Sequence, residues 1–340
     1  MKGLGALTGL YRGVVKAKNY LYEHDYLQAI EISVPVLSIG NLTMGGTGKT
    51  PLADFCIKYY LRKHLQVTVV SRNYRAEAKE ISKVDTKRPN AAQYYGDEPV
   101  LLAIRNPMID VFVGPEKFET AQVAVAKNPP QLVIIDDGFQ HRKLHRDLDI
   151  VILDATEKRE NYECIPTGRA REPFENLARA DAIVVTKINL VSEAEVNHLV
   201  SQLETQFGKP VFCFAFDLVR LMQKSVAPYR DLSGCGGLRC QLISGIGQPQ
   251  GFEDGIKKFG LVIDKHHRFE DHHVYTAENV ATIISDLERA GITDAITTEK
   301  DFVKLRALWP QDAPLWVAPL EVRLLGREDS FYEILDQVFH

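Results

Sequence analysis

Residues 38–51 read Ser-Ile-Gly-Asn-Leu-Thr-Met-Gly-Gly-Thr-Gly-Lys-Thr-Pro. The glycine-rich core follows an apolar run and precedes a helical pattern, which is the context of a P-loop. Glycine lets the backbone wrap around a phosphate, and the N-terminus of the following helix favours negative charge at the same point. Pro51 suits the first position of that helix, where no N–H partner is needed. The stretch therefore predicts a nucleotide-binding site.

The P-loop assigns roles to individual residues. We expect Lys49 to reach the β- and γ-phosphates of ATP, and the Thr50 hydroxyl to bind Mg²⁺. The full P-loop spacing has glycine where this chain has Thr43, and Gly45 and Gly46 can supply the missing flexibility. The residues predicted to contact the nucleotide are Thr43, Met44, Gly45, Gly46, Thr47, Gly48, Lys49 and Thr50.

Short β-branched runs alternate with helical patterns around this loop. The runs are apolar throughout, which is typical of parallel strands covered on both faces. Strand–helix alternation of this kind predicts a P-loop NTPase-like, doubly wound α/β domain. The expected strands are residues 34–39, 67–71, 109–113, 132–136, 149–153, 182–186 and 210–216, and the clearest helices are residues 52–64, 116–126 and 192–207.

The pattern changes near residue 217, and a second, smaller α/β block follows, with strands expected at 241–244 and 295–298. Residues 315–324 resemble residues 211–221 in pattern, so we expect the two segments to pair as a β linker between two domains. A final helix is expected at 330–339. The predicted organisation is an N-terminal helical region (1–30), a P-loop kinase domain (31–208), a linker strand (209–228), a smaller domain (229–312), and a return strand with the last helix (313–340).

Composition excludes several classes of protein. The 340 residues carry 41 Lys and Arg against 45 Asp and Glu, a net charge of −4, whereas a general nucleic-acid binder usually has a basic surplus. Five cysteines do not make a disulfide framework. No apolar run approaches the roughly 18–20 residues that a spanning helix needs. We therefore expect a protein of the cytoplasm or of the cytoplasmic face of a membrane, and the sequence leaves its oligomeric state open.

The first 18 residues form a basic, amphipathic pattern. On a helical wheel, Leu4, Leu7, Leu10, Tyr11, Val14, Val15 and Leu21 fall within one arc, and Lys2, Arg12 and Lys16 fall opposite. Such a helix can lie in a membrane interface. The alternative is a helix that docks on its own domain.

Candidate acidic residues follow the P-loop. Asp136 and Asp137 end an apolar strand, a Walker-B-like arrangement that binds Mg²⁺, although a capping aspartate in a turn is the alternative. Glu172 by itself would be a surface charge. Asp97, in Gly96-Asp-Glu-Pro99, could simply start a helix.

A histidine-rich stretch lies in the second block. His266, His267, His272 and His273 surround Asp271 within eight residues, which could form a metal site. No cysteine lies nearby and no histidines are spaced four apart, so an Asp271-His272 pair with a catalytic or orienting role is the alternative we favour.

These segments together resemble one family. The set is Gly40-Asn-Leu-Thr43, Gly45-Gly-Thr-Gly-Lys-Thr-Pro51, Ser71-Arg72, Gly96-Asp-Glu-Pro99, Asp136-Asp-Gly-Phe-Gln-His141, Leu144-His-Arg-Asp147, Arg171-Glu-Pro173, Gly245-Ile-Gly247, Asp271-His-His273 and Thr298-Glu-Lys-Asp301. In this order they resemble the tetraacyldisaccharide 4′-kinases of lipid A biosynthesis. The resemblance implies transfer of the γ-phosphate of ATP to the 4′-hydroxyl of a tetraacylated glucosamine disaccharide 1-phosphate, with Mg²⁺, by a peripheral enzyme on the cytoplasmic face of the inner membrane.

The resemblance also implies site roles. Asp97 matches the catalytic base of the family, His272 matches its dyad partner, and Lys49 completes the catalytic set. Asp136, Asp137 and Glu172 match the acidic positions of the metal site. The family fold, two α/β domains joined by a β linker, agrees with the organisation read from the patterns.

Two other classes of function compete with a kinase. Thr186-Lys-Ile-Asn189 loosely resembles the base-reading motif of GTPases, so a P-loop switch protein or metallochaperone is the main rival. It would hydrolyse GTP without lipid and respond to a protein partner. A non-catalytic nucleotide-binding scaffold would bind ATP without turning over any acceptor.

Overall fold

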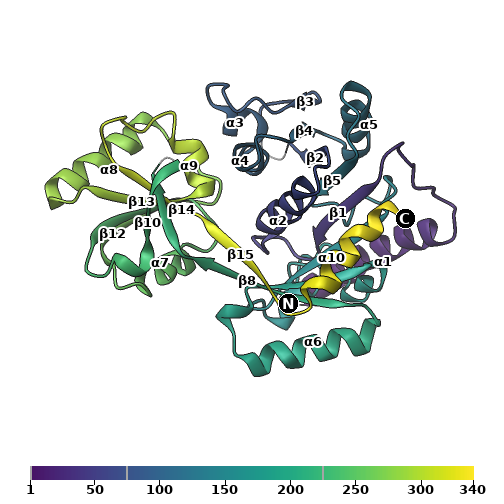
Figure 1. Ribbon diagram of the computed structural model, residues 1–340. Coiled ribbons are helices and arrows are strands. Elements are labelled where there is room, and N and C mark those ends of the chain that lie inside the picture. Colours follow the sequence, from purple (N-terminus) through teal and green to yellow (C-terminus); the bar gives the residue numbers. More distant parts are fainter. Residues whose placement is uncertain (1, 74–75, 224–225) are drawn as a thin grey trace.

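The computed structural model describes residues 2–73, 76–223 and 226–340 of the chain. Its strands form two sheets, one of nine strands in the order β15-β8-β7-β6-β1-β5-β2-β4-β3 and one of six in the order β10-β9-β14-β13-β11-β12 (Figure 1). Helices pack on both sheets. The fold is α/β, as the patterns predict.

The larger sheet is parallel from β8 to β4, and only its two edge strands run antiparallel to their neighbours. Most of the expected strands are found within two residues of their predicted ends. The strands are β1 (Val36–Asn41), β2 (Val67–Arg72), β3 (Ser82–Lys83), β4 (Asp110–Gly114), β5 (Leu132–Asp136), β6 (Leu148–Asp154), β7 (Ala182–Thr186), β8 (Val211–Leu218) and β15 (Leu320–Leu325).

Helices cover both faces of this sheet. On one face, α2 (Lys49–Arg62), α4 (Asp97–Arg105) and α10 (Glu328–Asp336) contribute to a single buried cluster with the strands. On the other face, α5 (Lys117–Lys127) packs over the β2–β5 half, and α6 (Glu193–Phe207) packs over the β6–β8 half. The short helix α3 (Ala91–Tyr95) precedes α4. The phosphate loop leaves β1 in the middle of the sheet, at the carboxyl edge where ligands bind in such folds.

Two boundaries at the phosphate loop differ from the expected ones. β1 continues through Gly40 and Asn41, which pair with Val151 and Ile152 of β6, so the strand carries Asn41 up to the loop. α2 begins at Lys49, and its first intrahelical bond runs from Leu52 N to Gly48 O. Pro51 is therefore the third helical residue, and the prediction that it starts the helix is wrong. The position tolerates proline because the first N–H groups of a helix have no intrahelical acceptor.

The smaller sheet holds the second block of the chain. Its strands are β9 (Arg220–Gln223), β10 (Val226–Asp231), β11 (Arg239–Ser244), β12 (Val262–Arg268), β13 (Asp294–Thr298) and β14 (Leu315–Ala318). α8 (Ala277–Ala290) and α9 (Glu299–Leu305) cover one face, and α7 (Pro249–Lys257) covers the other. β12 was not expected, because it is a largely exposed edge strand whose sequence is mostly polar.

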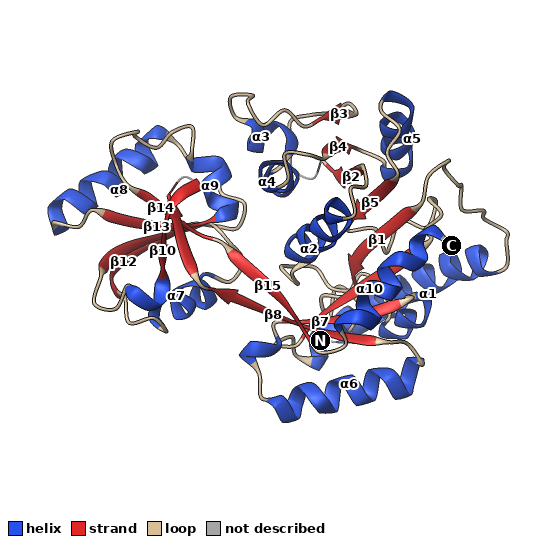
Figure 2. Ribbon diagram, viewed as in Figure 1, coloured by secondary structure: helices blue, strands red, loops and turns tan. Residues whose placement is uncertain are grey.

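The predicted pairing of residues 211–221 with residues 315–324 is confirmed. β8 and β15 pair antiparallel from Cys213–Leu325 to Leu218–Leu320, and β9 pairs with β14 beyond them. Figure 2 shows this two-stranded ribbon running from the edge of the large sheet into the small one. The chain thus enters and leaves the smaller domain along one ribbon.

A second contact joins the two domains. Helix α4 of the larger domain lies against α9 of the smaller one, and charged pairs cross between them. Arg105 Nε lies 2.9 Å from Glu299 Oε1, and Lys300 Nζ lies 2.5 Å from Glu98 Oε1. The interface therefore places the start of α4 next to the small domain.

Helix α1 (Lys2–Glu23) lies on the larger domain, apart from the smaller sheet (Figure 1). In the described part of the chain, no helix combines the length and the apolar character needed to cross a bilayer.

Candidate active site

The phosphate loop has a backbone that only glycine accommodates at two points. Gly45 and Gly48 have φ values of +121° and +95°, in the region that favours glycine. A Cβ atom on Gly48 would also lie 2.2 Å from the Phe216 ring. Gly48 is the residue that caps α2, so the loop delivers its N–H groups and the helix N-terminus to one place.

Asn41, at the end of β1, organises the loop from inside. Its Nδ2 donates to the Thr43 carbonyl (2.6 Å) and to Thr47 Oγ1 (2.8 Å), and its Oδ1 accepts from Lys49 Nζ (3.2 Å). Thr43, Thr47 and Thr50 are buried, whereas Met44 is about half exposed. Asn41 was not among the residues assigned a role from the sequence, although it lies within residues 38–51.

The ends of β6 and β7 hold the loop from behind. Thr186 Oγ1 donates to the Thr47 carbonyl (2.8 Å), and Lys187 Nζ donates to the Gly46 carbonyl (2.9 Å) and to Asp154. Asn189 makes a pair of hydrogen bonds with the backbone of Phe216. The three residues that resemble a GTPase base-reading motif are thus hydrogen-bonded to the protein itself.

Asp136 and Asp137 end β5 beside Lys49. An oxygen of Asp137 lies 3.6 Å from Lys49 Nζ, and the carboxylate makes a bidentate ion pair with the Arg171 guanidinium. Burial opposes ionisation of Asp137, but the charges of Lys49 and Arg171 hold its pKa well below the usual range. Asp136 has the opposite balance: burial and the negative charge of Glu98 raise its pKa to about 6.

The acidic pair has features of a magnesium site. Asp136 Oδ2 accepts from Ser71 (3.0 Å), while Asp136 Oδ1 is buried and has no hydrogen-bond partner among the described residues. A buried carboxylate oxygen of this kind, with a second carboxylate beside it, fits the oxygen ligands that Mg²⁺ takes. Within the described ranges, no three His, Cys, Asp or Glu side chains form a metal site by themselves. The ion would therefore need phosphate or water oxygens as well.

The main-chain turn that carries these carboxylates rests on a buried lysine. Asp137 has a φ of +55°, a conformation that non-glycine residues rarely adopt. Lys117, only 1% exposed, donates from Nζ to the carbonyls of Asp136 (2.5 Å) and Asp137. Burial lowers the pKa of Lys117 to about 8. This contact could not be predicted from the sequence, because a lysine in the first turn of an amphipathic helix normally faces solvent.

Arg171 and Glu172 are neighbours with different partners. Arg171 bonds Asp137 and the Asn41 carbonyl (3.1 Å), so it belongs to the phosphate-binding centre. Glu172 Oε2 instead accepts from Asn19 of α1, Asn176 and Arg179. The assignment of Glu172 to the metal site stays a prediction, and its hydrogen bonds lie elsewhere.

The structure brings Asp97 and His272 together across the domain interface. Asp97 is the first residue of α4, so the helix-start reading also holds, and its Oδ2 lies 2.9 Å from His272 Nδ1. His272 follows β12 in a left-handed conformation, with φ of +62°. The pair exists only because α4 and the small domain are in contact.

Electrostatics keep this pair ionised. Burial by itself would raise the pKa of Asp97, but the hydrogen bond from His272 and the charge of Lys300 hold it below its usual value. The same hydrogen bond raises the pKa of His272 above its ordinary value of 6.5. The hydrogen bond therefore favours the ionised form of both partners, so His272 keeps its proton to a higher pH than a free histidine does.

The other histidines of this stretch have separate partners. His266 contacts Ser244 and Glu253, His267 contacts Gln241, and His273 contacts Asn279. Asp271 lies 3.8 Å from His272 Nε2. Each of these histidines therefore has a different hydrogen-bond partner, and among them His272 is the one that contacts Asp97 of the larger domain.

Comparison with known proteins covers the whole chain. A family model described as tetraacyldisaccharide-1-P 4'-kinase matches residues 2–340. The chain belongs to this family. It is therefore a kinase, and the rival classes of switch protein and scaffold are set aside.

Individual relatives of the family support the assignment. The tetraacyldisaccharide 4'-kinase of Bdellovibrio bacteriovorus is 44% identical over 335 residues, which is 98% of each chain. That of Chlorobium limicola is 34% identical, over 97% of this chain and 96% of the relative. The crystal structure of LpxK from Aquifex aeolicus in complex with ATP is 27% identical, with a TM-score of 0.78, and covers 100% of this chain and 99% of the other. The two-domain P-loop architecture is thus that of a solved member of the family.

The buried lysine gives a first prediction. We expect Lys117→Met to lower kcat by about tenfold or more, because the turn at Asp137 loses the donor that holds both carbonyls, and small misplacements at a reacting centre are costly. Lys127→Met, in the last turn of the same helix and exposed, is the matched control. Steady-state phosphoryl-transfer kinetics of the two variants provide the measurement. Equal rates for both would show that the lysine does not support the turn.

The interdomain pair gives a second prediction, on pH. In the wild type, His272 should keep its proton to a pH above 6.5, and its ion pair with Asp97 should stabilise the domain contact most at lower pH and weaken as pH rises through the raised pKa. In Asp97→Asn the pKa of His272 should fall towards 6.5. Histidine ¹³C NMR titration, assigned with His272→Gln, measures both values. An unchanged pKa in Asp97→Asn would contradict the pairing.

Proposed function

We propose that this kinase transfers the γ-phosphate of ATP to the 4′-hydroxyl of a tetraacylated glucosamine disaccharide 1-phosphate, the step that forms lipid IVA in lipid A biosynthesis. Family membership over the whole chain supports the substrate pair. The observation that supports the mechanism is the hydrogen bond between Asp97 of one domain and His272 of the other. Glu98, the neighbour of Asp97, is close enough to Asp136 for its charge to raise the pKa of that carboxyl.

The phosphate end of the mechanism uses the loop and its cations. Phosphoryl transfer to an alcohol has a loose transition state, so catalysis is mostly positioning and charge neutralisation. Residues 43–50 bind the nucleotide, with Lys49 at the β- and γ-phosphates. Thr50, Asp136 and Asp137 would hold Mg²⁺, which neutralises phosphate charge when bound. Glu172 is not included in this proposal, because its Oε2 already accepts from three donors.

The acceptor end uses the dyad. Asp97 accepts the proton of the sugar hydroxyl as the oxygen attacks the γ-phosphorus. His272 orients the carboxylate through Nδ1 and keeps it ionised while the domains are in contact. General-base assistance of this type contributes roughly 10²–10⁴-fold to rate. The ion pair with Glu98 holds Lys300 beside the dyad. From there the positive charge of Lys300 lowers the pKa of Asp97 and so favours its ionised form.

A transfer assay tests the reaction and the base together. With [γ-³²P]ATP and tetraacyldisaccharide 1-phosphate in detergent micelles, the wild type should yield a labelled lipid on thin-layer chromatography. Asp97→Asn should lose roughly 10²–10⁴-fold in kcat with little change in ATP binding, and Lys49→Ala should also lose catalysis. Asp85→Asn, an exposed carboxylate in the same domain, is the control. Near-full kcat in Asp97→Asn would remove Asp97 as the base, and no labelled lipid from the wild type would remove the substrate assignment.

We further propose that α1 binds the cytoplasmic surface of the inner membrane. The helix does dock on its own domain, as the alternative expects, but its hydrogen bonds and ion pair use polar side chains. Leu7, Leu10 and Val14 are 57%, 68% and 62% exposed, and the side chains buried against the domain are the polar Thr8 and Asn19. An outward apolar stripe on a surface helix fits a lipid interface better than water.

Charge and neighbouring residues fit the same surface. Lys18 is exposed beside the apolar stripe, whereas Lys16 lies opposite it, and each basic residue near anionic lipid is worth about 1 kcal/mol. The side chain of Lys2 lies outside the described residues. Tyr26, Leu27 and Ile30, which follow the helix in the chain, are also exposed.

Vesicle binding tests the membrane role. The double variant Leu7→Ser/Leu10→Ser should lower partition onto phosphatidylglycerol-containing vesicles by about tenfold or more, since each exposed leucine that enters the interface is worth on the order of 1–2 kcal/mol. Met108→Ser removes an apolar side chain that is more exposed than either leucine but lies outside α1, and should leave partition unchanged. Co-sedimentation measures both. Equal co-sedimentation of the wild type, the double variant and the Met108→Ser control would contradict membrane binding by α1.

A further inference from the structure

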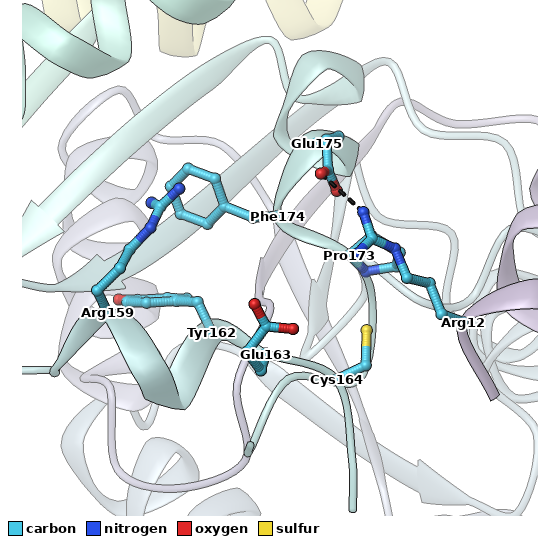
Figure 3. A pocket seen from close by; sticks show the side chains of 8 residues that line it. All are labelled: Arg12, Arg159, Tyr162, Glu163, Cys164, Pro173, Phe174 and Glu175. Atoms are coloured by element: carbon cyan, nitrogen blue, oxygen red, sulfur yellow. Dashed lines mark hydrogen bonds and ion pairs between the residues drawn. The ribbon is translucent and has the colours of Figure 1, made fainter. Parts of the chain in front are cut away.

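Helix α1 contacts two parts of the larger domain, residues 140–142 and residues 167–175, and the second of these leads to the phosphate loop. Tyr11 Oη donates to the Arg171 carbonyl (2.8 Å), and Asn19 Nδ2 donates to Glu172 Oε2 (3.1 Å). Figure 3 shows the outer edge of this contact, where Arg12 reaches Glu175 (2.8 Å) beside a pocket of about 70 Å³. Thr8 and Thr167 form a further hydrogen bond near the helix start.

The same part of the chain contacts the phosphate loop on its other side. We name residues 169–172 the bridging segment. Arg171 N donates to the Leu42 carbonyl (2.8 Å), and Met44 N donates to the Arg169 carbonyl (2.9 Å), so the segment pairs with the residues that lead into the loop. The Arg171 guanidinium then bonds Asp137 and the Asn41 carbonyl. One layer of backbone thus separates α1 from the phosphate-binding centre.

The contact between Asn19 and Glu172 is the most buried of this set. Asn19 is 6% exposed and Glu172 is 3% exposed. Arg142 donates to the Asn19 carbonyl (3.1 Å), and Arg179 donates to the same Glu172 oxygen (2.6 Å). Buried carboxylates require such donors. Loss of the Asn19 amide would remove the one donor that α1 itself provides to Glu172.

We propose that α1 is a structural part of the phosphate-binding centre, and that Asn19 and Tyr11 are positioning residues for phosphoryl transfer. They act through Glu172 and the Arg171 carbonyl, which fix the bridging segment and hold the Arg171 guanidinium against Asp137 and Asn41. The inference rests on the proposed function. The helix whose outward stripe binds the membrane thereby sets the geometry of the catalytic centre with its inward face.

Two variants test the positioning role. Asn19→Ala removes the amide without lowering helix propensity. Tyr11→Phe removes only a hydroxyl, so this second variant should fold normally even if Asn19→Ala does not. Each should lower kcat by about fivefold or more in detergent micelles, with the KM for lipid and the partition onto vesicles unchanged within twofold. Ala17→Ser, on an exposed position of the same helix, is the matched control and should leave kcat unchanged.

Amide hydrogen exchange gives a readout that does not depend on activity. In Asn19→Ala and Tyr11→Phe, peptides covering residues 42–44 and 169–172 should exchange faster than in the wild type, while peptides of the smaller domain should not change. Unchanged exchange and unchanged kcat would overturn the proposal, and so would an effect confined to the KM for lipid. Failure of the wild type to label any lipid would instead refute the proposed function, and the exchange result would still decide whether α1 holds the bridging segment.

Discussion

The buried Asp136 ends β5 and the partly exposed Asp137 follows it, and most of the site is arranged around the negative charge of this pair. Asp137 is kept ionised by Lys49 from the phosphate loop and by Arg171 from the bridging segment. Lys117 holds the main chain of the same turn from beneath. Removing Lys49 or Arg171 would leave the negative charge of Asp137 with fewer compensating partners, which is unfavourable in a partly buried place. The phosphate loop, α5 and residues 169–172 are therefore coupled through one electrostatic requirement.

The second requirement is that the two domains meet. The larger domain supplies Asp97 at the start of α4, and the smaller supplies His272 after β12, so neither contains the dyad alone. The ion pairs between α4 and α9 place charged groups around this contact, and one of them, Lys300, contributes to the ionisation of Asp97. Domain contact and the protonation of the proposed base are thus linked in the same few residues.

The sequence predicted the parts of the molecule that depend on local pattern. The parallel strands, the phosphate loop and the β8–β15 pairing follow from apolar runs, glycine spacing and matched segments, because these signals are short-range. The identity of Asp97 and His272 as partners came from family resemblance, since 175 residues separate them in the chain. Lys117 and Asn41 were missed because their roles depend on which main-chain atoms the fold brings within reach. The orientation of α1 could not be predicted either, because an amphipathic pattern does not show which face of the helix packs on the protein.

The ribbon of β8 and β15 makes the smaller domain an insertion in the larger one. Leu218 and Leu320 are directly paired partners at the point where the ribbon leaves the large sheet. A two-residue turn could join them and close an ordinary β-hairpin at the sheet edge. The larger domain would then retain its nine strands, its phosphate loop and its acidic pair, and would lack only the groups that the insertion carries to Asp97. In modular terms, the host domain carries the phosphate loop and the proposed base Asp97, and the inserted domain carries the histidine that completes the proposed dyad.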